Sequence, residues 1–304
     1  LLNKTINLSS IETDNAKICF SKMAVDSVPN FKFVFDALSN RDTLNVKKEI
    51  AFHLDVKQVQ LKNIAFSFCK EKLMNLKILL ADANINLNKV NLQTGLVDVK
   101  SATLSSPIVS IEKLGIDTTP IPPEDTVIIH LNSKKFHLLV ESLKLQNATF
   151  KYDADASVRD STRFDAKHMY SKNINATFNN ASFIKDTIKA RIDQLTFTEQ
   201  SGLSVKNLSA NLKVTTTESM LSDLKLQTEQ SLIQNKFGFV YTNFHSFWRF
   251  ISDVRLKANF NHSYLSSTDL AFFIPTIPNN KLNVNIDGEI NGSIDRLQFR
   301  NFIA

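Results

Sequence analysis

The chain has 304 residues, of which 43% are hydrophobic and 22% charged, a composition that excludes an intrinsically disordered protein. Its formal net charge of +6 comes from Lys and Arg residues scattered singly along the chain, so we expect a solvated polar face and no nucleic-acid partner. Gly occurs only 6 times and Pro 7 times, so the turns must be built from Asn, Asp, Ser and Lys.

Both ends of the chain lie inside apolar patterns, at Leu1-Leu2 and at Ile303-Ala304. We therefore expect an internal piece of a longer protein. No run approaches the roughly 18 apolar residues that a membrane-spanning helix needs. The two cysteines, Cys19 and Cys69, make no disulfide framework, and we expect buried thiols rather than a bridge or a metal pair. The sequence leaves open whether they pair.

Apolar and polar residues alternate with period two through most of the chain, which predicts strands with one buried and one wet face. Such strands are predicted over residues 44–56, from 127 onward, and over 188–192, 208–214, 237–241 and 282–294. We expect the following apolar residues to line the sheltered face: Ile50, Phe52, Leu54, Ile129, Leu131, Ile188, Ile192, Leu208, Leu212, Phe237, Phe239, Leu256, Phe260, Val284 and Ile286. A single sequence leaves the inward phase of each strand open.

One segment is written twice, since residues 56–68 return as residues 140–152 with matching apolar, Asn and aromatic positions. In each copy the apolar positions change parity at the Asn, which is Asn63 in the first copy and Asn147 in the second. A one-residue slip sends side chains to the opposite face, so we expect a β-bulge or tight bend at both positions. Repeated bends of this kind predict a sheet that curls, built from similar units.

The proline-rich segment 117–125 is the best boundary in the chain, because consecutive prolines cannot pair in a sheet. We expect a block over 1–120 and a second block over 126–304, continuous with the first as one incomplete array.

Two short helices are predicted between the later strands. The first follows Asn243, where Phe244, Phe247 and Ile251 have helical spacing, and the second follows Ser266. We expect both to plug the edge or mouth of a sheet, and the alternative is that they gate or contact a lipid.

Constellations that carry chemistry are missing from the sequence. The glycines do not cluster into a phosphate-binding loop, and no two of the six histidines have metal-ligand spacing. The run from Asp153 to Asp160 resembles a calcium loop only superficially, because Val158 and Phe164 replace its Gly and its bidentate Glu. We therefore expect a polar hairpin tip there, and a protein that is not an enzyme and has no metal or cofactor.

The repeated pattern, apolar-x-Leu-x-Asn-x-x-Phe-x-aromatic, resembles the AsmA/TamB class of envelope proteins, as do residues 104–111 and 282–297. Residues 164–208, with Phe164-Asp-Ala-Lys167, Ser201-Gly202-Leu203 and similar short motifs, resemble Bacteroidota-type TamB proteins. The resemblance is best over residues 127–304 and weaker before residue 120. It rests on the alternation of apolar and polar positions and on the placing of turn residues, not on catalytic motifs.

The resemblance implies an all-β fold, namely a long, twisted antiparallel repeating β-groove: a U-shaped open sheet with an apolar concave face and a few short helices. It also implies a non-enzymatic protein of the periplasm of a diderm bacterium, anchored in the inner membrane in its full-length form. The implied role is phospholipid transport between the inner and outer membranes, together with outer-membrane biogenesis. The implied partners are phospholipid acyl chains, both membranes through terminal segments, and an outer-membrane BamA/TamA-like barrel.

The residues themselves leave two other interpretations open. One is a structural extracellular β-solenoid or adhesin-like array, whose apolar face is filled by its own side chains. The other is an outer-membrane protein assembly factor that binds strands at a sheet edge. A solenoid would have a closed, dry core, whereas a groove of roughly 15–20 strands would leave apolar side chains accessible along about 70–95 Å.

Overall fold

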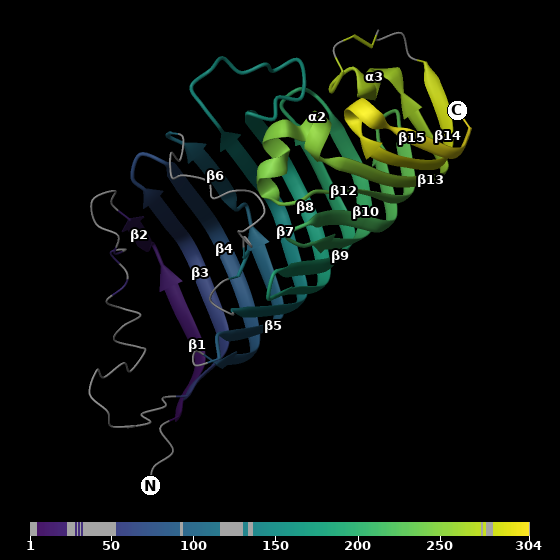
Figure 1. Ribbon diagram of the computed structural model, residues 1–304. Coiled ribbons are helices and arrows are strands. Elements are labelled where there is room, and N and C mark those ends of the chain that lie inside the picture. The colour runs from purple at the N-terminus through teal and green to yellow at the C-terminus, as the bar shows by residue number, and fades with distance from the viewer. Residues whose placement is uncertain are drawn as a thin grey trace.

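The computed structural model describes residues 5–22, 28, 30, 32, 53–91, 94–115, 130–132, 136–274, 276–277 and 282–303. These residues confirm the predicted all-β class, because they form one 15-stranded sheet with only short helical segments (Figure 1). The elements are β1 (Thr5–Asp14), β2 (Lys17–Lys22), β3 (His53–Lys70), β4 (Met74–Asn91), β5 (Leu96–Ser105), β6 (Ile108–Lys113), β7 (His137–Asp153), β8 (His168–Ile184), β9 (Thr187–Glu199), β10 (Ser204–Val214), β11 (Glu218–Thr228), β12 (Leu232–Val240), η1 (Phe244–Arg249), α2 (Phe250–Asp253), β13 (Arg255–Ser266), α3 (Ser267–Leu270), β14 (Asn283–Ser293), η2 (Ile294–Arg296) and β15 (Gln298–Ile303).

Strand pairing follows the order of the chain. The path runs β1-β3-β4-β5-β7-β8-β9-β10-β11-β12-β13-β14-β15. Strand β2 pairs β3 beyond the end of β1, and β6 pairs β4 and β7 beyond the end of β5, so each of these couples forms one broken strand. Thirteen strands on the path, about 4.8 Å apart, give a sheet roughly 60 Å wide, which is shorter than the expected span.

The expectation of a wholly antiparallel sheet is wrong at two places. Strands β1 and β2 run parallel to β3, and β5 and β6 run parallel to β7. Parallel neighbours need a long crossover connection, which residues 23–52 and 114–136 supply. The predicted boundary at residues 117–125 falls in the second connection and outside the described residues, and the strands before and after it belong to one sheet.

The two copies of the repeated segment occupy equivalent positions. Residues 56–68 lie in β3 and residues 140–152 in β7, and each of these strands follows a crossover and runs parallel to a broken strand. At each break, one backbone hydrogen bond joins the broken strand to its parallel neighbour, just before the left-handed Asn of that neighbour. The Asn15 N–H donates to the Lys62 carbonyl at 3.0 Å, and the Ser106 N–H donates to the Gln146 carbonyl at 2.8 Å.

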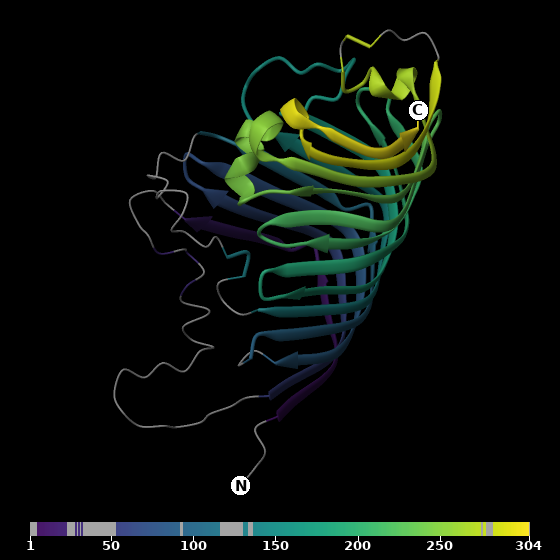
Figure 2. The same cartoon turned by 45° about the vertical axis from the view of Figure 1, so that its right-hand side comes forward.

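Many strands contain a residue with left-handed backbone. Asn63 and Asn147, where the sequence predicts a bend, have φ values of 51° and 52°. The same region of φ is occupied by Asn173 and Asn180 in β8, Asp223 in β11, Asn235 in β12, His262 in β13, Gly288 in β14 and Asn301 in β15. Asn and Asp tolerate this conformation better than other residues with a side chain. Figure 2 shows the consequence, because the strands turn sharply and the sheet curves around one side.

The later strand and helix predictions agree with the structure except at one point. The predicted strands over 188–192, 208–214 and 237–241 lie in β9, in β10 and in β12 with the residue after it. The two predicted helices are η1 with α2, and α3, whose first N–H groups are capped by the Ser266 hydroxyl, which accepts from the Thr268 N–H. Ile294 does not continue a strand but starts η2, because the chain must turn there between β14 and β15.

The expectation of two buried thiols is also wrong. Cys19 is exposed and Cys69 half-buried, and both are free. Each alternates with an aromatic residue, Phe20 or Phe68, and pairs across the sheet with a polar residue, Ser67 or Asn75. The two thiols therefore lie on the polar face.

Tight packing is concentrated at the C-terminal end of the sheet. Ala258, Phe260 and Ile286 form a buried cluster, supported by Ile233, Phe237, Leu265, Ile290 and Phe302.

The left-handed residues generate the first prediction. Replacing Asn147 by Val is expected to lower the free energy of unfolding by about 1–2 kcal/mol, because a β-branched residue is strained at φ 52°. Replacing Asn147 by Gly is expected to change it by less than about 1 kcal/mol. The measurement is urea denaturation followed by circular dichroism. Asn207→Val is the control, because Asn207 in β10 is not left-handed, and an equal loss in both Val variants would contradict the prediction.

Candidate functional site

One row of apolar residues crosses the sheet through successive cross-strand pairs. Its first part consists of Ile11, Val59, Ile85, Ala102, Leu143, Phe178, Ile192 and Ala210. Two residues further along β10 it continues through Leu212, Leu221, Phe237, Ala258, Ile290 and Phe299. Directly paired residues project from the same face of a sheet. One apolar row therefore runs from β1 to β15.

A second row lies beside the first. It consists of Leu61, Ala83, Leu104, Leu145, Ala176, Leu195, Leu208, Leu226 and Ile233. The residues between the two rows point to the other face and are polar: for example, Lys144 pairs with Thr177. We call the face that carries both rows the apolar face.

The apolar pattern changes phase where the backbone bends. In β7, Leu143 and Leu145 belong to the two rows, but after Asn147 the apolar residues are Ala148 and Phe150. A bulge reverses the alternation of side chains, so residues on both sides of it stay on one face. Beyond the bend, the apolar face continues in two further rows. They are Phe66, Ile78, Val109 and Phe150, and then Phe68, Leu76, Ile111, Tyr152 and Met169.

The apolar face is the concave one. Phe239, which shares a face with Phe237, contacts Phe247 of η1 and Phe250 of α2, with ring centroids 6.3 and 5.4 Å apart. These helical turns lie on the open side of the curved sheet in Figure 2, opposite the bend of the strands. Since paired residues share a face, the assignment extends along the whole row.

Large side chains on this face remain partly accessible. Among the fully buried members are small residues, including Ala83, Ala176 and Ala210, with exposed fractions of 1%, 4% and 5%. Leu143, Phe178, Leu212, Leu221 and most other large members are only half-buried. An accessible apolar surface of this extent is unusual for a protein that has no ligand or partner for it.

Most of the lining residues expected from sequence lie on the apolar face. These are Ile188, Ile192, Leu208, Leu212, Phe237, Phe239, Leu256, Phe260, Val284 and Ile286. Leu131 is half-buried but lies outside the strands, before Asn132, whose N–H donates to Asp186. Ile50, Phe52 and Ile129 lie outside the described residues, and Leu54 is placed only by its backbone, paired with Ile6.

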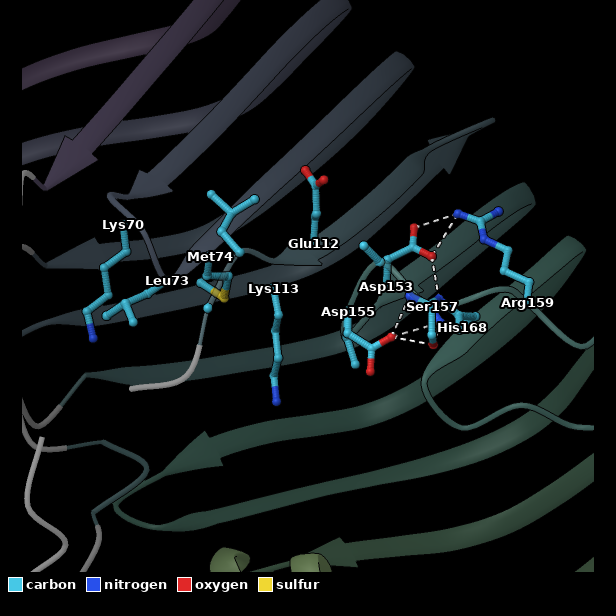
Figure 3. A pocket seen from close by; sticks show the side chains of 14 residues that line it. Lys70, Leu73, Met74, Glu112, Lys113, Asp153, Asp155, Ser157, Arg159 and His168 are labelled. Carbon is cyan, nitrogen blue, oxygen red and sulfur yellow. Dashed lines mark hydrogen bonds and ion pairs between the residues drawn. The ribbon is translucent and has the colours of Figure 1, made fainter. Parts of the chain in front are cut away.

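A pocket opens at one rim of the sheet, where β3, β6 and β7 end and β4 and β8 begin (Figure 3). Its volume is about 1010 Å³. Its walls come from the β3–β4 turn, the end of β6 and the β7–β8 loop (residues 154–167). Sequence reasoning missed it because strand register, which the sequence does not display, brings these three segments together.

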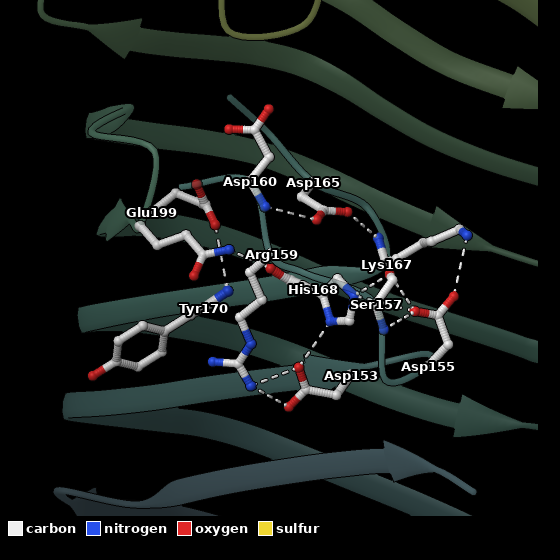
Figure 4. Close-up of polar contacts among 11 residues, drawn as sticks. Asp153, Asp155, Ser157, Arg159, Asp160, Asp165, Lys167, His168, Tyr170 and Glu199 are labelled. Carbon is white, nitrogen blue, oxygen red and sulfur yellow. Dashed lines mark hydrogen bonds and ion pairs between the residues drawn. The ribbon is translucent and has the colours of Figure 1, made fainter. Parts of the chain in front are cut away.

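A polar cluster around His168 holds the β7–β8 loop in place (Figure 4). The His168 ring is 2% exposed, with Nδ1 3.1 Å from Asp153 Oδ1 and Nε2 3.0 Å from Ser157 Oγ. Arg159 binds both oxygens of Asp153 at 2.7 and 2.8 Å. Lys167 binds Asp155 at 3.1 Å.

The chain of contacts from Asp153 through His168 to Ser157 superficially resembles the Asp-His-Ser triad of a serine hydrolase. However, Ser157 Oγ lies 2.5 Å from Asp155 Oδ1, so its proton is directed at that carboxylate rather than at the imidazole. His168 Nε2 is itself 3.3 Å from the same oxygen. A nucleophile needs a base that accepts its proton. The cluster is therefore arranged to fix the β7–β8 loop. This loop is the polar hairpin tip that the sequence predicts from Asp153 to Asp160.

The ionisation of Asp155 contributes to that arrangement. Hydrogen bonds from the Ser157 hydroxyl and the Ser157 N–H, followed by one from Lys167, hold the pKa of the Asp155 carboxyl well below its usual value. The loop also reaches the C-terminal end of the sheet, where the Phe164 N–H donates to the Phe272 carbonyl at 2.9 Å.

In the described part of the chain, no group of three His, Cys, Asp or Glu side chains is placed to hold a metal ion. Within the same residues, no helix is long and apolar enough to cross a membrane. Comparison with protein-family models, with curated proteins and with solved structures finds no match to this chain.

The polar cluster generates the second prediction. A carboxyl whose pKa is lowered by folding stabilises the protein above its unfolded pKa, here 3.8, and this contribution is lost as the pH falls through the folded value. Asp155→Asn is therefore expected to lower Tm near neutral pH, and the difference is expected to shrink as the pH falls below 3.8.

Differential scanning calorimetry over a pH series measures this difference. Ser157→Ala removes the hydroxyl that contributes most to the lowered pKa, so it is expected to reproduce part of the effect. A Tm difference that does not depend on pH would contradict the assignment.

Proposed function

We propose that this protein is a non-enzymatic, lipid-conducting β-groove. In this proposal the concave apolar face holds phospholipid acyl chains, and the protein supports phospholipid transport between the inner and outer membranes of a diderm bacterium and outer-membrane biogenesis. The observation that carries the proposal is the series of apolar cross-strand pairs, which runs from β1 to β15 with one step of two residues along β10 and whose large members are left half-buried.

The energetics of acyl chains support the proposal. Each CH₂ group exposed to water costs about 0.8 kcal/mol, so a chain that crosses an aqueous compartment needs continuous apolar contact. The rows extend across the sheet, roughly 60 Å, without a charged member in the middle of the sheet. The curvature leaves the concave side open, so a polar headgroup can remain in water while its chains lie on the strands.

The equivalent placement of the two repeated segments supports a repeating groove. Each copy lies in a bent strand that follows a crossover and runs parallel to a broken strand. Further units of this kind would lengthen the apolar face and leave the curvature of the sheet unchanged. A periplasmic location, an inner-membrane anchor and an outer-membrane barrel as partner belong to the same proposal, and they rest on the resemblance of the sequence motifs.

The solenoid alternative accounts less well for these observations. A solenoid fills its interior with its own side chains and closes upon itself. Here the path of pairing runs from β1 to β15 without joining its ends, and the buried cluster is confined to β12–β15. An assembly factor that binds strands at β1 or β15 shares the fold, and it would not need an apolar face along the whole sheet.

The third prediction tests the proposed groove. Phospholipid is expected to co-purify with the protein from the periplasm of a Gram-negative host and to be detected by native mass spectrometry. Leu143→Glu or Leu212→Glu, each on the apolar face, is expected to reduce lipid occupancy by at least about tenfold, because a carboxylate beside an acyl chain costs more than about 1.4 kcal/mol.

Leu79→Glu is the matched control. Leu79 is 47% exposed and lies between Ile78 and Leu80, so it points to the opposite face, and this variant is expected to retain lipid. A folded, lipid-free wild-type protein would overturn the proposal. An equal loss of lipid in Leu79→Glu would show that occupancy does not depend on the face.

A further inference from the structure

A further apolar row follows the rim of the sheet that lies opposite the pocket, and we call it the rim row. Ile188 and Phe239 belong to it, so the row projects from the apolar face, because directly paired residues share a face. All of its members are half-buried. From β5 to β13, direct cross-strand pairs join Val97, Leu138, Phe183, Ile188, Val214, Ser219, Phe239 and Leu256.

The rim row runs into η1 and α2 at Phe239. Phe247 of η1 and Phe250 of α2 lie edge-on to the Phe239 ring, with ring centroids 6.3 and 5.4 Å away. Figure 2 shows both helical turns on the open side of the curved sheet, and α2 also contacts β14 and η2. The helical turns therefore cover the apolar face where the row passes from β12 to β13.

The segment that carries these turns, residues 242–253, is firmly packed at both ends and loosely packed between them. Before it, Tyr241 is 4% exposed, and its hydroxyl donates to the Thr215 carbonyl at 3.0 Å. After it, Val254 is 1% exposed. Between these residues, none of the four residues of α2 is buried, and Phe247 is 37% exposed. Segments with few buried apolar contacts open at the least cost.

The segment also carries polar contacts of its own. Arg249 binds Asp253 through Nε at 2.8 Å and through a terminal nitrogen at 2.7 Å, and the Ser252 hydroxyl donates to the same carboxylate at 2.7 Å. These contacts lie within the segment, so they are kept when it moves as one unit. Both firmly packed ends can then act as hinges.

Hydrocarbon can replace the contacts that the segment makes with the sheet. The Phe239 ring contacts Phe237, with centroids 5.4 Å apart, as well as Phe247 and Phe250. Hydrophobic burial is non-directional and roughly proportional to the area removed from water. An acyl chain that lies on Phe239 therefore restores the burial that is lost when the two phenylalanines of the segment leave.

We infer that residues 242–253 form a lid on the C-terminal end of the apolar face, and that this lid lifts when an acyl chain on the rim row passes Phe239 and reaches Leu256. This inference rests on the proposed lipid groove. In the closed arrangement, Phe247 and Phe250 take the place of hydrocarbon on Phe239. The lid then sets whether lipid continues from β12 to β13.

The first test loosens the lid. A photoreactive residue replaces either Leu256, beyond the covered position, or Ile188, before it. The purified full chain is mixed with phosphatidylglycerol in detergent micelles, and lipid adducts are counted by mass spectrometry. Phe250→Ser is expected to raise adducts at position 256 by about threefold, because one aromatic contact of the lid is lost, and to leave those at 188 within about twofold.

Ile251→Ser is the matched control. Ile251 is the next residue of α2 and is 62% exposed, so its loss leaves the contact with Phe239 intact. This variant is expected to give wild-type adducts at both positions. A rise at position 256 equal to that in Phe250→Ser would overturn the inference, because the effect would not depend on the underside of the lid.

The second test locks the lid. Phe239→Cys/Phe250→Cys is joined by a short thiol-reactive linker that a reductant cleaves, in a Cys19→Ser/Cys69→Ser background, because both native thiols are free. The locked protein is expected to lose adducts at position 256, to keep those at 188, and to regain the former when the linker is cleaved. Phe250→Cys alone, treated with the same linker, is the control and is expected to keep both.

The two positions separate the lid from the groove. Adducts at 188 together with equal adducts at 256 in the locked and cleaved proteins would overturn the lid and leave the groove standing. A wild-type protein without adducts at either position would contradict the groove itself, and the inference with it.

Discussion

A sheet that bends must still keep its apolar side chains on one face, and left-handed residues within the strands meet this constraint. If the alternation of side chains continued unbroken through Asn147, the apolar residues after it, Ala148 and Phe150, would lie on the opposite face from Leu143 and Leu145. In β7 the chain reverses its apolar phase at Asn147, where φ is 52°, and β8 does the same at Asn173. In the strands that contain a left-handed residue, the curvature and the continuity of the apolar face therefore have one cause. In β9 the phase changes between Ile192 and Leu195 at a register shift against β8, without a left-handed residue.

This cause also explains why Asn is used so often and Gly so rarely. Asn adopts the left-handed region at small cost and still offers an amide to its neighbours: for example, the Asn63 side chain donates to Asp14 across the β1–β3 pair. The N–H of Asn147 in turn donates to the Asn175 side-chain oxygen at 3.0 Å. Gly occurs where another backbone segment leaves no room for a side chain, as at Gly288, where a Cβ would lie 2.4 Å from the Asn301 carbonyl oxygen.

Local patterns in the sequence were sufficient to predict the all-β class, most strands after residue 187, both short helices and the phase change at Asn63 and Asn147. They did not predict the parallel pairs beside β3 and β7, because pairing across residues 23–52 and 114–136 depends on contacts between distant segments. The rim pocket was missed for the same reason. A signal existed, since Phe66, Phe68 and Lys70 share one phase, as do Val109, Ile111 and Lys113, but register alone brings the two lysines together.

The measurement that tests the account most directly is site-specific photo-crosslinking to phospholipid along β7. A photoreactive residue is placed in turn at positions 143 to 151 of the full chain in the periplasm. The account predicts lipid adducts at 143 and 145, none at 144 and 146, and then adducts at 148 and 150 but not at 149 and 151, with the change of phase at Asn147. Adducts that ignore this alternation, or no adducts at all, would contradict a lipid-bearing apolar face.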